Sequence, residues 1–221
     1  MAAQGGHERR SYRADEMKSK IAKPSASKRS SQPRARALSE SDLRCVYSEK
    51  QIHKRVRELA KQIDHDYKGK TLHVVGILED CFVFMADLVR SLTMPVVCHF
   101  MKAEIHDTSA GTTAVREIMY TPKVEAAGRD VLLVDGILQS GLTLDHLYSY
   151  VLGQNPSSVR TASLFEKSGE RKVDVSTDYV GFKTKEKFLV GYGLGYEEKY
   201  RNLPFVARLA RAGEASNRRA G

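Results

Sequence analysis

Residues 131–147 read VLLVDGILQSGLTLDHL, and the fold class can be inferred from this stretch outward. Four apolar residues run into the acidic Asp135, a loop with glycines and small hydroxyls follows, and a helical pattern then begins. This is the layout of a phosphate-binding turn, where free backbone N–H groups, the helix dipole and nearby hydroxyls can hold a dianionic phosphate. Gly141 would let the backbone approach such a ligand closely. An ordinary strand-to-helix turn is the alternative, because Gly and Ser are common in turns.

The segments around this turn alternate between strand-like and helix-like patterns. Residues 71–78 resemble a buried strand, 81–92 a helix and 95–103 a second strand, which together make a βαβ unit of a parallel sheet. Further strands are expected at 129–136, 159–166, 178–182 and 188–193, and a helix at 142–153. The fold class is therefore α/β, with a mostly parallel sheet flanked by helices on both faces. Ligands would bind beyond the carboxyl ends of the strands, at residues 78–80 and 135–143.

An earlier helix is marked by its first turn. Ser48 and Gln51 form a capping-box pattern. Apolar residues then follow at spacings of four, three and four from Ile52 to Ile63, which predicts an amphipathic helix.

The chain of 221 residues is long enough for one domain with a sizeable core and two tails. Residues 1–44 carry 11 Lys or Arg against 5 Asp or Glu, so +6 of the total charge of +9 lies there. This segment is rich in Ser, Pro and Ala, which predicts a disordered basic tail, and residues 212–221 are similar. The folded domain is expected at residues 45–211.

Composition also bounds the partners and the compartment. A basic tail can contact nucleic acid or a membrane surface, but a solvated tail is favoured, since it lacks the interleaved aromatic residues used for base stacking. No apolar run reaches the roughly 20 residues of a membrane span, and the N-terminus lacks the apolar core of a secretory signal. Three cysteines without metal-ligand spacing predict free thiols in a reducing cytoplasm.

Six blocks between residues 46 and 209 occur in an order typical of one family. They read GKTLHVVGIL, FMADLVRSLTMPV, GRDVLLVDGILQSGLTL, NPSSVRTASLFEKSGERKVDV, DYVGF and FLVGYGLGYEEKYRNLP. In these blocks the chain resembles the bacterial-type hypoxanthine-guanine phosphoribosyltransferases. The resemblance implies a type I phosphoribosyltransferase fold with a small hood over the purine, in subunits that form dimers or tetramers. It also implies a reaction in which a 6-oxopurine attacks phosphoribosyl pyrophosphate, with Mg²⁺, to give IMP or GMP.

The resemblance assigns a role to each matching residue. The 5′-phosphate would be bound by Gln139, Ser140, Gly141, Leu142 and Thr143, the ribose by Asp135 and Gly136, the purine by Ile137, Lys167, Phe188 and Leu189, and the pyrophosphate near Glu79, Asp80 and Arg201. Within this set, Lys167 would donate to the purine 6-oxo group and Phe188 would stack on the ring. On composition alone, core packing is the preferred interpretation of Phe188 and Ile137.

The chain departs from the family where the chemistry takes place. Gln139 replaces the aspartate that acts as general acid and base, and an amide cannot take a proton at neutral pH. Gly136 and Gly195 replace acidic residues, the second of them a metal ligand. Glu79 and Asp80 replace the Lys-Gly of the pyrophosphate turn, and two unit charges about 4 Å apart repel by about 4 kcal/mol at an effective dielectric of about 20.

The family's mobile lid is also replaced. HDTSAGTT stands at residues 106–113, within a polar stretch at 104–114 that predicts a long loop. A strand is expected beside it at 115–120.

These departures favour a catalytically impaired protein that binds purine 5′-monophosphates, as a sensor or as a subunit paired with an active relative. The first alternative is an active or weakly active salvage enzyme that makes IMP or GMP from hypoxanthine or guanine. The second is a rewired enzyme in which Glu79, Asp80 and Asp135 hold a divalent metal and serve another phosphorylated substrate. The third makes the fold a scaffold and the basic tail the functional element.

Overall fold

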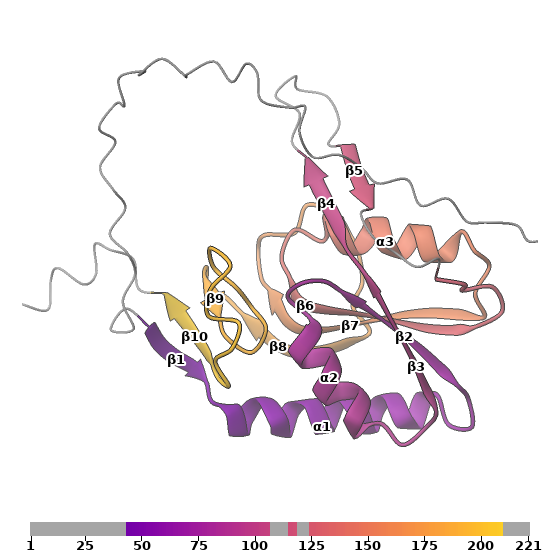
Figure 1. Ribbon diagram of the computed structural model, residues 1–221, viewed down its shortest axis with the longest axis horizontal. Coiled ribbons are helices and arrows are strands. Elements are labelled where there is room, and N and C mark those ends of the chain that lie inside the picture. The colour runs from indigo at the N-terminus through magenta and orange to yellow at the C-terminus, as the bar shows by residue number, and fades with distance from the viewer. Residues whose placement is uncertain (1–42, 107–114, 119–123, 210–221) are drawn as a thin grey trace, which may run out of the picture. The chain divides into compact units, whose positions relative to one another are not determined.

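The computed structural model describes residues 43–106, 115–118 and 124–209 (Figure 1). The helices are α1 (Glu49–Asp66), α2 (Phe82–Ser91) and α3 (Leu142–Leu152). The strands are β1 (Leu43–Tyr47), β2 (Leu72–Ile77), β3 (Val96–Met101), β4 (Ala103–His106), β5 (Val115–Ile118), β6 (Asp130–Leu138), β7 (Ser158–Lys167), β8 (Tyr179–Thr184), β9 (Leu189–Val190) and β10 (Val206–Leu209). These strands form a five-stranded sheet in the order β3-β2-β6-β7-β8, a three-stranded sheet β1-β10-β9 and the pair β4-β5.

The five-stranded sheet is parallel throughout, which confirms the α/β prediction. Its central strand β6 is buried on both faces from Val131 to Val134, and this is why its sequence is an unbroken apolar run. β2 pairs with β6 from Leu72 opposite Asp130 to Gly76 opposite Val134. The turns that follow these two strands therefore lie beside each other.

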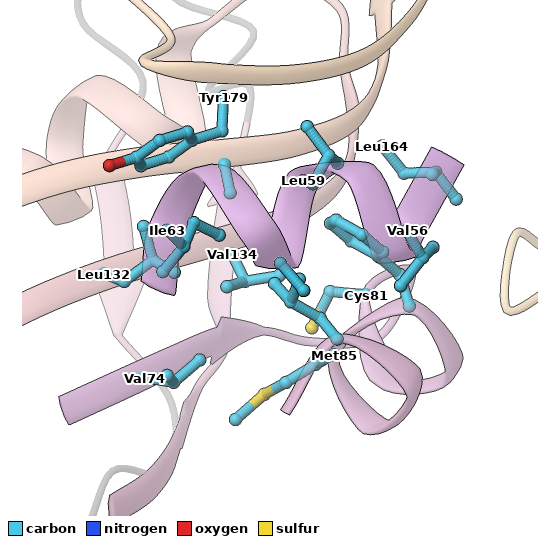
Figure 2. Packing of buried hydrophobic residues seen from close by; sticks show 14 of the residues in the cluster. Val56, Leu59, Ile63, Val74, Cys81, Met85, Leu132, Val134, Leu164 and Tyr179 are labelled. Atoms are coloured by element: carbon cyan, nitrogen blue, oxygen red, sulfur yellow. The ribbon is translucent and has the colours of Figure 1, made fainter. Parts of the chain in front are cut away.

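Helix α1 begins at the predicted capping box. The Ser48 hydroxyl accepts from the Gln51 N–H at 3.4 Å, and the Gln51 side chain accepts from the Ser48 N–H at 2.9 Å. Figure 2 shows Val56, Leu59 and Ile63 of this helix in the hydrophobic cluster that covers one face of the sheet.

Helices cover both faces of the sheet, as predicted. Leu132 belongs to the cluster of α1 and α2, whereas its neighbour Leu133 belongs to a second cluster with α3. Successive strand residues point to opposite faces, so α3 packs on the face opposite α1. Leu144, Leu147 and Val151 form its buried side.

The three-stranded antiparallel sheet corresponds to the expected hood. β1 pairs with β10, with Leu43 opposite Leu209. The Tyr47 ring lies 5.0 Å from the Phe165 ring and 4.6 Å from the Phe182 ring, centroid to centroid. These ring contacts attach the small sheet to β7 and β8.

The structure differs from the sequence predictions at the edges of the domain. β1 and β10 are not predicted by the sequence patterns. The strand expected at 188–193 is reduced to β9, because the chain turns at Gly191, where φ is +96° and an added Cβ would lie 2.1 Å from the Phe205 carbonyl oxygen.

The predicted loop at 104–114 is wrong at its start, because residues 104–106 belong to β4, which pairs with β5. β5 covers residues 115–118 of the strand predicted at 115–120. Residues 107–113 of the expected lid lie outside the described residues. The predicted tails also lie outside them, except that residues 43 and 44 belong to β1.

None of the described helices is long and apolar enough to cross a membrane. All three cysteines are free thiols, which confirms that prediction; Cys45 and Cys98 are exposed, and Cys81 is buried. Burial raises the pKa of Cys81, and the nearby charges of Asp135 and Asp80 raise it further.

The packing of α1 can be tested at Leu59, which is fully buried. Leu59→Ala should lower the free energy of unfolding by about 2–5 kcal/mol, because it removes apolar contacts and leaves a cavity. Leu152→Ala is the matched control, since Leu152 is 52% exposed, and it should change stability by less than about 0.5 kcal/mol. Urea unfolding followed by circular dichroism measures both, and equal losses would contradict this packing.

Candidate functional site

The predicted phosphate turn lies between β6 and α3 and lines a pocket of about 560 Å³. Gln139, Ser140, Gly141 and Thr143 contribute to the lining, while Leu142 starts α3 and is not part of it. The Leu142 N–H donates to the Ser140 hydroxyl at 3.4 Å. A helix N-terminus with adjacent hydroxyls can hold a phosphate dianion.

Gly141 is required by the turn itself. Its φ is +81°, in the left-handed region that favours glycine. An added Cβ would lie 2.9 Å from the Val175 side chain and 3.0 Å from that of Val173. The glycine therefore leaves room for these valines, and its close approach to a ligand stays a prediction.

Asp135 lies in the carboxyl-terminal half of β6, where it lines the pocket together with Asp80. Its carboxylate accepts from the Ile137 N–H at 3.4 Å. Removal from water raises the pKa of Asp135 to about 7, with the charge of Asp80 adding to the shift and backbone N–H groups opposing it. Near neutral pH, Asp135 is therefore able either to donate or to accept a proton.

Lys167, which the resemblance assigns to the purine, is buried at the end of β7. Its ammonium group donates to the Lys187 carbonyl oxygen at 2.5 Å and lies 3.9 Å from the Glu170 carboxylate. Burial lowers the pKa of Lys167, and Glu170 opposes that change.

The other predicted purine contacts are Phe188, Leu189 and Ile137. Phe188 is 49% exposed, and its ring meets that of Tyr196 edge-on at 6.2 Å. Leu189 is buried in β9, and Ile137 lines the pocket while it packs against the first hydrophobic cluster. The exposed part of the Phe188 ring is the part available for stacking on a base.

Sequence reasoning missed Glu170 and Lys172, which both line the pocket. The Glu170 carboxylate accepts from the Gln139 side-chain amide, so it connects the phosphate turn to Lys167. Its position three residues after Lys167 is visible in the sequence, but its contact with Gln139 depends on the fold.

At the predicted pyrophosphate position, Glu79 and Asp80 pair with cations. Arg201 lies 3.2 Å from the Glu79 carboxylate and also pairs with the Asp80 carboxylate. Lys102, another residue that the sequence analysis missed, lies 3.3 Å from Glu79. The repulsion expected at this turn is therefore relieved within the protein.

The proposed metal cluster of Glu79, Asp80 and Asp135 is not formed. The described residues contain no group of three or more His, Cys, Asp or Glu side chains that could hold a metal ion. Gly195, at the family's metal position, supplies no ligand, and Arg201 fills the space beside it. The residues described at this site do not fit a resident Mg²⁺ ion.

A parallel sheet with a phosphate turn after its central strand and a small hood defines a type I phosphoribosyltransferase. A family model described as a phosphoribosyl transferase domain matches residues 46–197. The hypoxanthine-guanine phosphoribosyltransferase of Dictyostelium discoideum is 42% identical over 168 residues, which are 74% of this chain and 93% of that protein. The relative of the same name from Aquifex aeolicus is 39% identical over 165 residues, 74% of this chain and 93% of that protein.

Solved structures agree with these relatives. A hypoxanthine-guanine phosphoribosyltransferase from Bacillus anthracis is 36% identical, with a TM-score of 0.72, and the match covers 76% of this chain and 98% of that one. A hypoxanthine phosphoribosyltransferase from Staphylococcus aureus has a TM-score of 0.73 at 33% identity, over 76% and 92% of the two chains. The chain belongs to the hypoxanthine-guanine phosphoribosyltransferase family, as its motifs predicted.

The raised pKa of Asp135 predicts how stability depends on pH. A carboxyl with a pKa of about 7 when folded and an ordinary value of 3.8 contributes fully below that ordinary value, and its contribution is lost as pH rises through 7. Asp135→Asn has no carboxyl to titrate at this position. As pH rises within this window, the free energy of unfolding of the wild type should therefore fall relative to that of the variant by up to about 1.4 kcal/mol per pH unit. Urea unfolding at about pH 5 and about pH 8 measures the difference.

The control for this experiment is Asp174→Asn, at an exposed position outside the pocket. Its stability relative to the wild type should not change between the two pH values. The same pH-independent behaviour in Asp135→Asn would contradict the raised pKa.

Proposed function

We propose that this protein is a purine phosphoribosyltransferase that makes IMP or GMP from a 6-oxopurine and phosphoribosyl pyrophosphate. One observation carries the proposal: the phosphate turn, Asp135 and Glu170 line one pocket, and Glu170 forms an ion pair with Lys167. It is supported by relatives that are named hypoxanthine-guanine phosphoribosyltransferases and align over 93% of their length. These relatives favour the first alternative from the sequence over the impaired protein.

In this proposal each group acts on a different part of the substrates. The amides and hydroxyls of residues 139–143 hold the 5′-phosphate and so position the ribose. Asp135 accepts from the ribose hydroxyls, Lys167 donates to the purine 6-oxo group, and Phe188 stacks on the ring. The diphosphate of the substrate would bring its own Mg²⁺, which would supply charge neutralisation for the leaving group.

Turnover is expected to be slow. Gln139 cannot exchange a proton, and general acid–base catalysis typically contributes about 10²–10⁴-fold. Positioning and electrostatic stabilisation remain, so the loss of one proton-transfer group need not abolish the reaction.

A second function is binding of purine 5′-monophosphates without turnover, as a sensor or as a subunit beside an active relative. It is favoured by the internal contacts of Arg201 with Glu79 and Asp80. These contacts engage groups that a diphosphate substrate would otherwise use. A monophosphate does not require them to be released.

The wider organisation stays a prediction. We propose tails at residues 1–42 and 212–221 beside the domain, with nucleic-acid contact by the basic tail as an alternative to a solvated tail. Pairing of subunits through the family's dimer surface and a reducing cytoplasm both fit the family and the free thiols.

A steady-state assay distinguishes the two functions. The full chain is incubated with phosphoribosyl pyrophosphate, Mg²⁺ and each of hypoxanthine, guanine and xanthine, and the nucleotide product is separated by chromatography. IMP and GMP binding is measured in parallel by calorimetry. Product formation supports the transferase, and binding without product supports the second function. If neither product nor binding is observed, both functions are contradicted.

Lys167→Ala should lower kcat/KM for the purine by about tenfold to a hundredfold, because a hydrogen bond from a charged group is worth about 1.5–3 kcal/mol. The KM for phosphoribosyl pyrophosphate should change little. Lys183→Ala, an exposed lysine of β8, is the matched control and should leave both parameters unchanged. Wild-type purine kinetics in Lys167→Ala would contradict the assigned role.

Restoring an acid at position 139 should increase turnover. Gln139→Asp combined with Glu170→Gln places a carboxylate there without the repulsion of Glu170, and kcat should rise by about tenfold or more. The uncharged control Gln139→Asn, also combined with Glu170→Gln, should show no such rise. Equal gains in both variants would point to altered geometry rather than to proton transfer.

A further inference from the structure

The turn between β2 and α2 is bound to a distant part of the chain by Arg201. The guanidinium group contacts the Asp80 carboxylate, lies 3.2 Å from the Glu79 carboxylate and donates to the Gly193 carbonyl oxygen at 2.7 Å. We call Glu79, Asp80 and Arg201 the carboxylate latch. The guanidinium fork fits a carboxylate in the same way that it fits a phosphate.

Two glycines create the space that the latch occupies. An added Cβ at Gly136 would lie 2.2 Å from the Asp80 carbonyl oxygen, and one at Gly195 would lie 2.7 Å from the central carbon of the Arg201 guanidinium. A side chain at either position would therefore force the latch to move. Both glycines stand where the resemblance expects acidic residues. An acidic side chain at either position would collide with the latch, so the ion pairs of the latch require the two glycines.

The latch lies beside the phosphate turn. Asp80 lines the same pocket as Gln139 and Thr143, because β2 and β6 end at the same edge of the sheet. A ligand with its 5′-phosphate on this turn and a second anionic group near the end of β2 would meet Glu79 and Asp80 there. It would have to compete with them for Arg201.

We propose that the carboxylate latch takes the place of a diphosphate in this site. It makes the protein select purine nucleotides and sugars with a single 5′-phosphate over sugars that also carry a 1-diphosphate. This selection rests on the proposed function only for the 5′-phosphate site at residues 139–143. Turnover with phosphoribosyl pyrophosphate then requires the latch to open, and diphosphate binding is the unfavourable step.

Pyrophosphate binding tests the latch directly. Calorimetry with sodium pyrophosphate in the presence of Mg²⁺ compares the full chain with the double variant Glu79→Gln, Asp80→Asn. The variant should bind pyrophosphate at least about tenfold more tightly, because two negative charges are removed and Arg201 is released. Equal affinity in the two proteins would overturn the proposal.

The matched control removes two negative charges elsewhere. Glu58→Gln with Glu125→Gln breaks the surface pairs with Arg55 and Arg129 and should leave pyrophosphate affinity unchanged. Adding Arg201→Ala to the latch variant should abolish its gain. If pyrophosphate affinity rose equally in the surface control, the effect would be due to net charge, and the latch proposal would be overturned.

GMP binding separates this inference from the proposed function. GMP affinity should rise by a smaller factor than pyrophosphate affinity in the latch variant, since Asp80 lines the shared pocket but the phosphate turn itself is unchanged. Absence of GMP binding in every protein, together with a gain in pyrophosphate affinity, would reject the 5′-phosphate site and keep the latch. Thermal unfolding verifies that each variant is folded, and Asp80→Asn alone repeats the test if the double variant is not.

Discussion

The parallel pairing of β2 with β6 positions both the hydrophobic core and the candidate site. It brings the ends of both strands to one edge of the sheet, with Gly76 opposite Val134 as the last pair. The close approach of Gly136 to the Asp80 carbonyl oxygen then holds the turn after β2 against the last residues of β6. A shift of register by one residue would exchange the β6 side chains that pack with α1 and α2 for those that pack with α3. The pocket and the core are therefore specified by the same pairing.

The elements that could be predicted from the sequence have signals within a few neighbouring residues. The capping box at Ser48, the apolar run of β6 and the helix that follows Gly141 are of this kind. β1 and β10 are not, because these short strands exist through pairing with each other from opposite ends of the described chain. Strand propensity is weak when the partner is unknown. The turn at Gly191 likewise depends on the distant Phe205 backbone.

The location of the candidate site could be predicted, but most of its contacts could not. The order of the motifs located the phosphate turn, and the turn lines a pocket in the structure. In the sequence, Glu79 and Asp80 are two negative charges with no visible partner, because Arg201 lies more than a hundred positions later. Only the fold shows that they are neutralised, and only the fold shows Glu170 beside Gln139. Family membership therefore predicts the site, while the three-dimensional contacts decide which ligand it prefers.

The partnership of β1 with β10 also sets an order of events during synthesis. β1 leaves the ribosome before every other described strand, and its partner leaves after all of them. All strands of the parallel sheet and all three described helices are synthesised before Val206, the first residue of β10. A nascent chain halted before Val206 would already contain the turn after β6, whereas its hood would still be open.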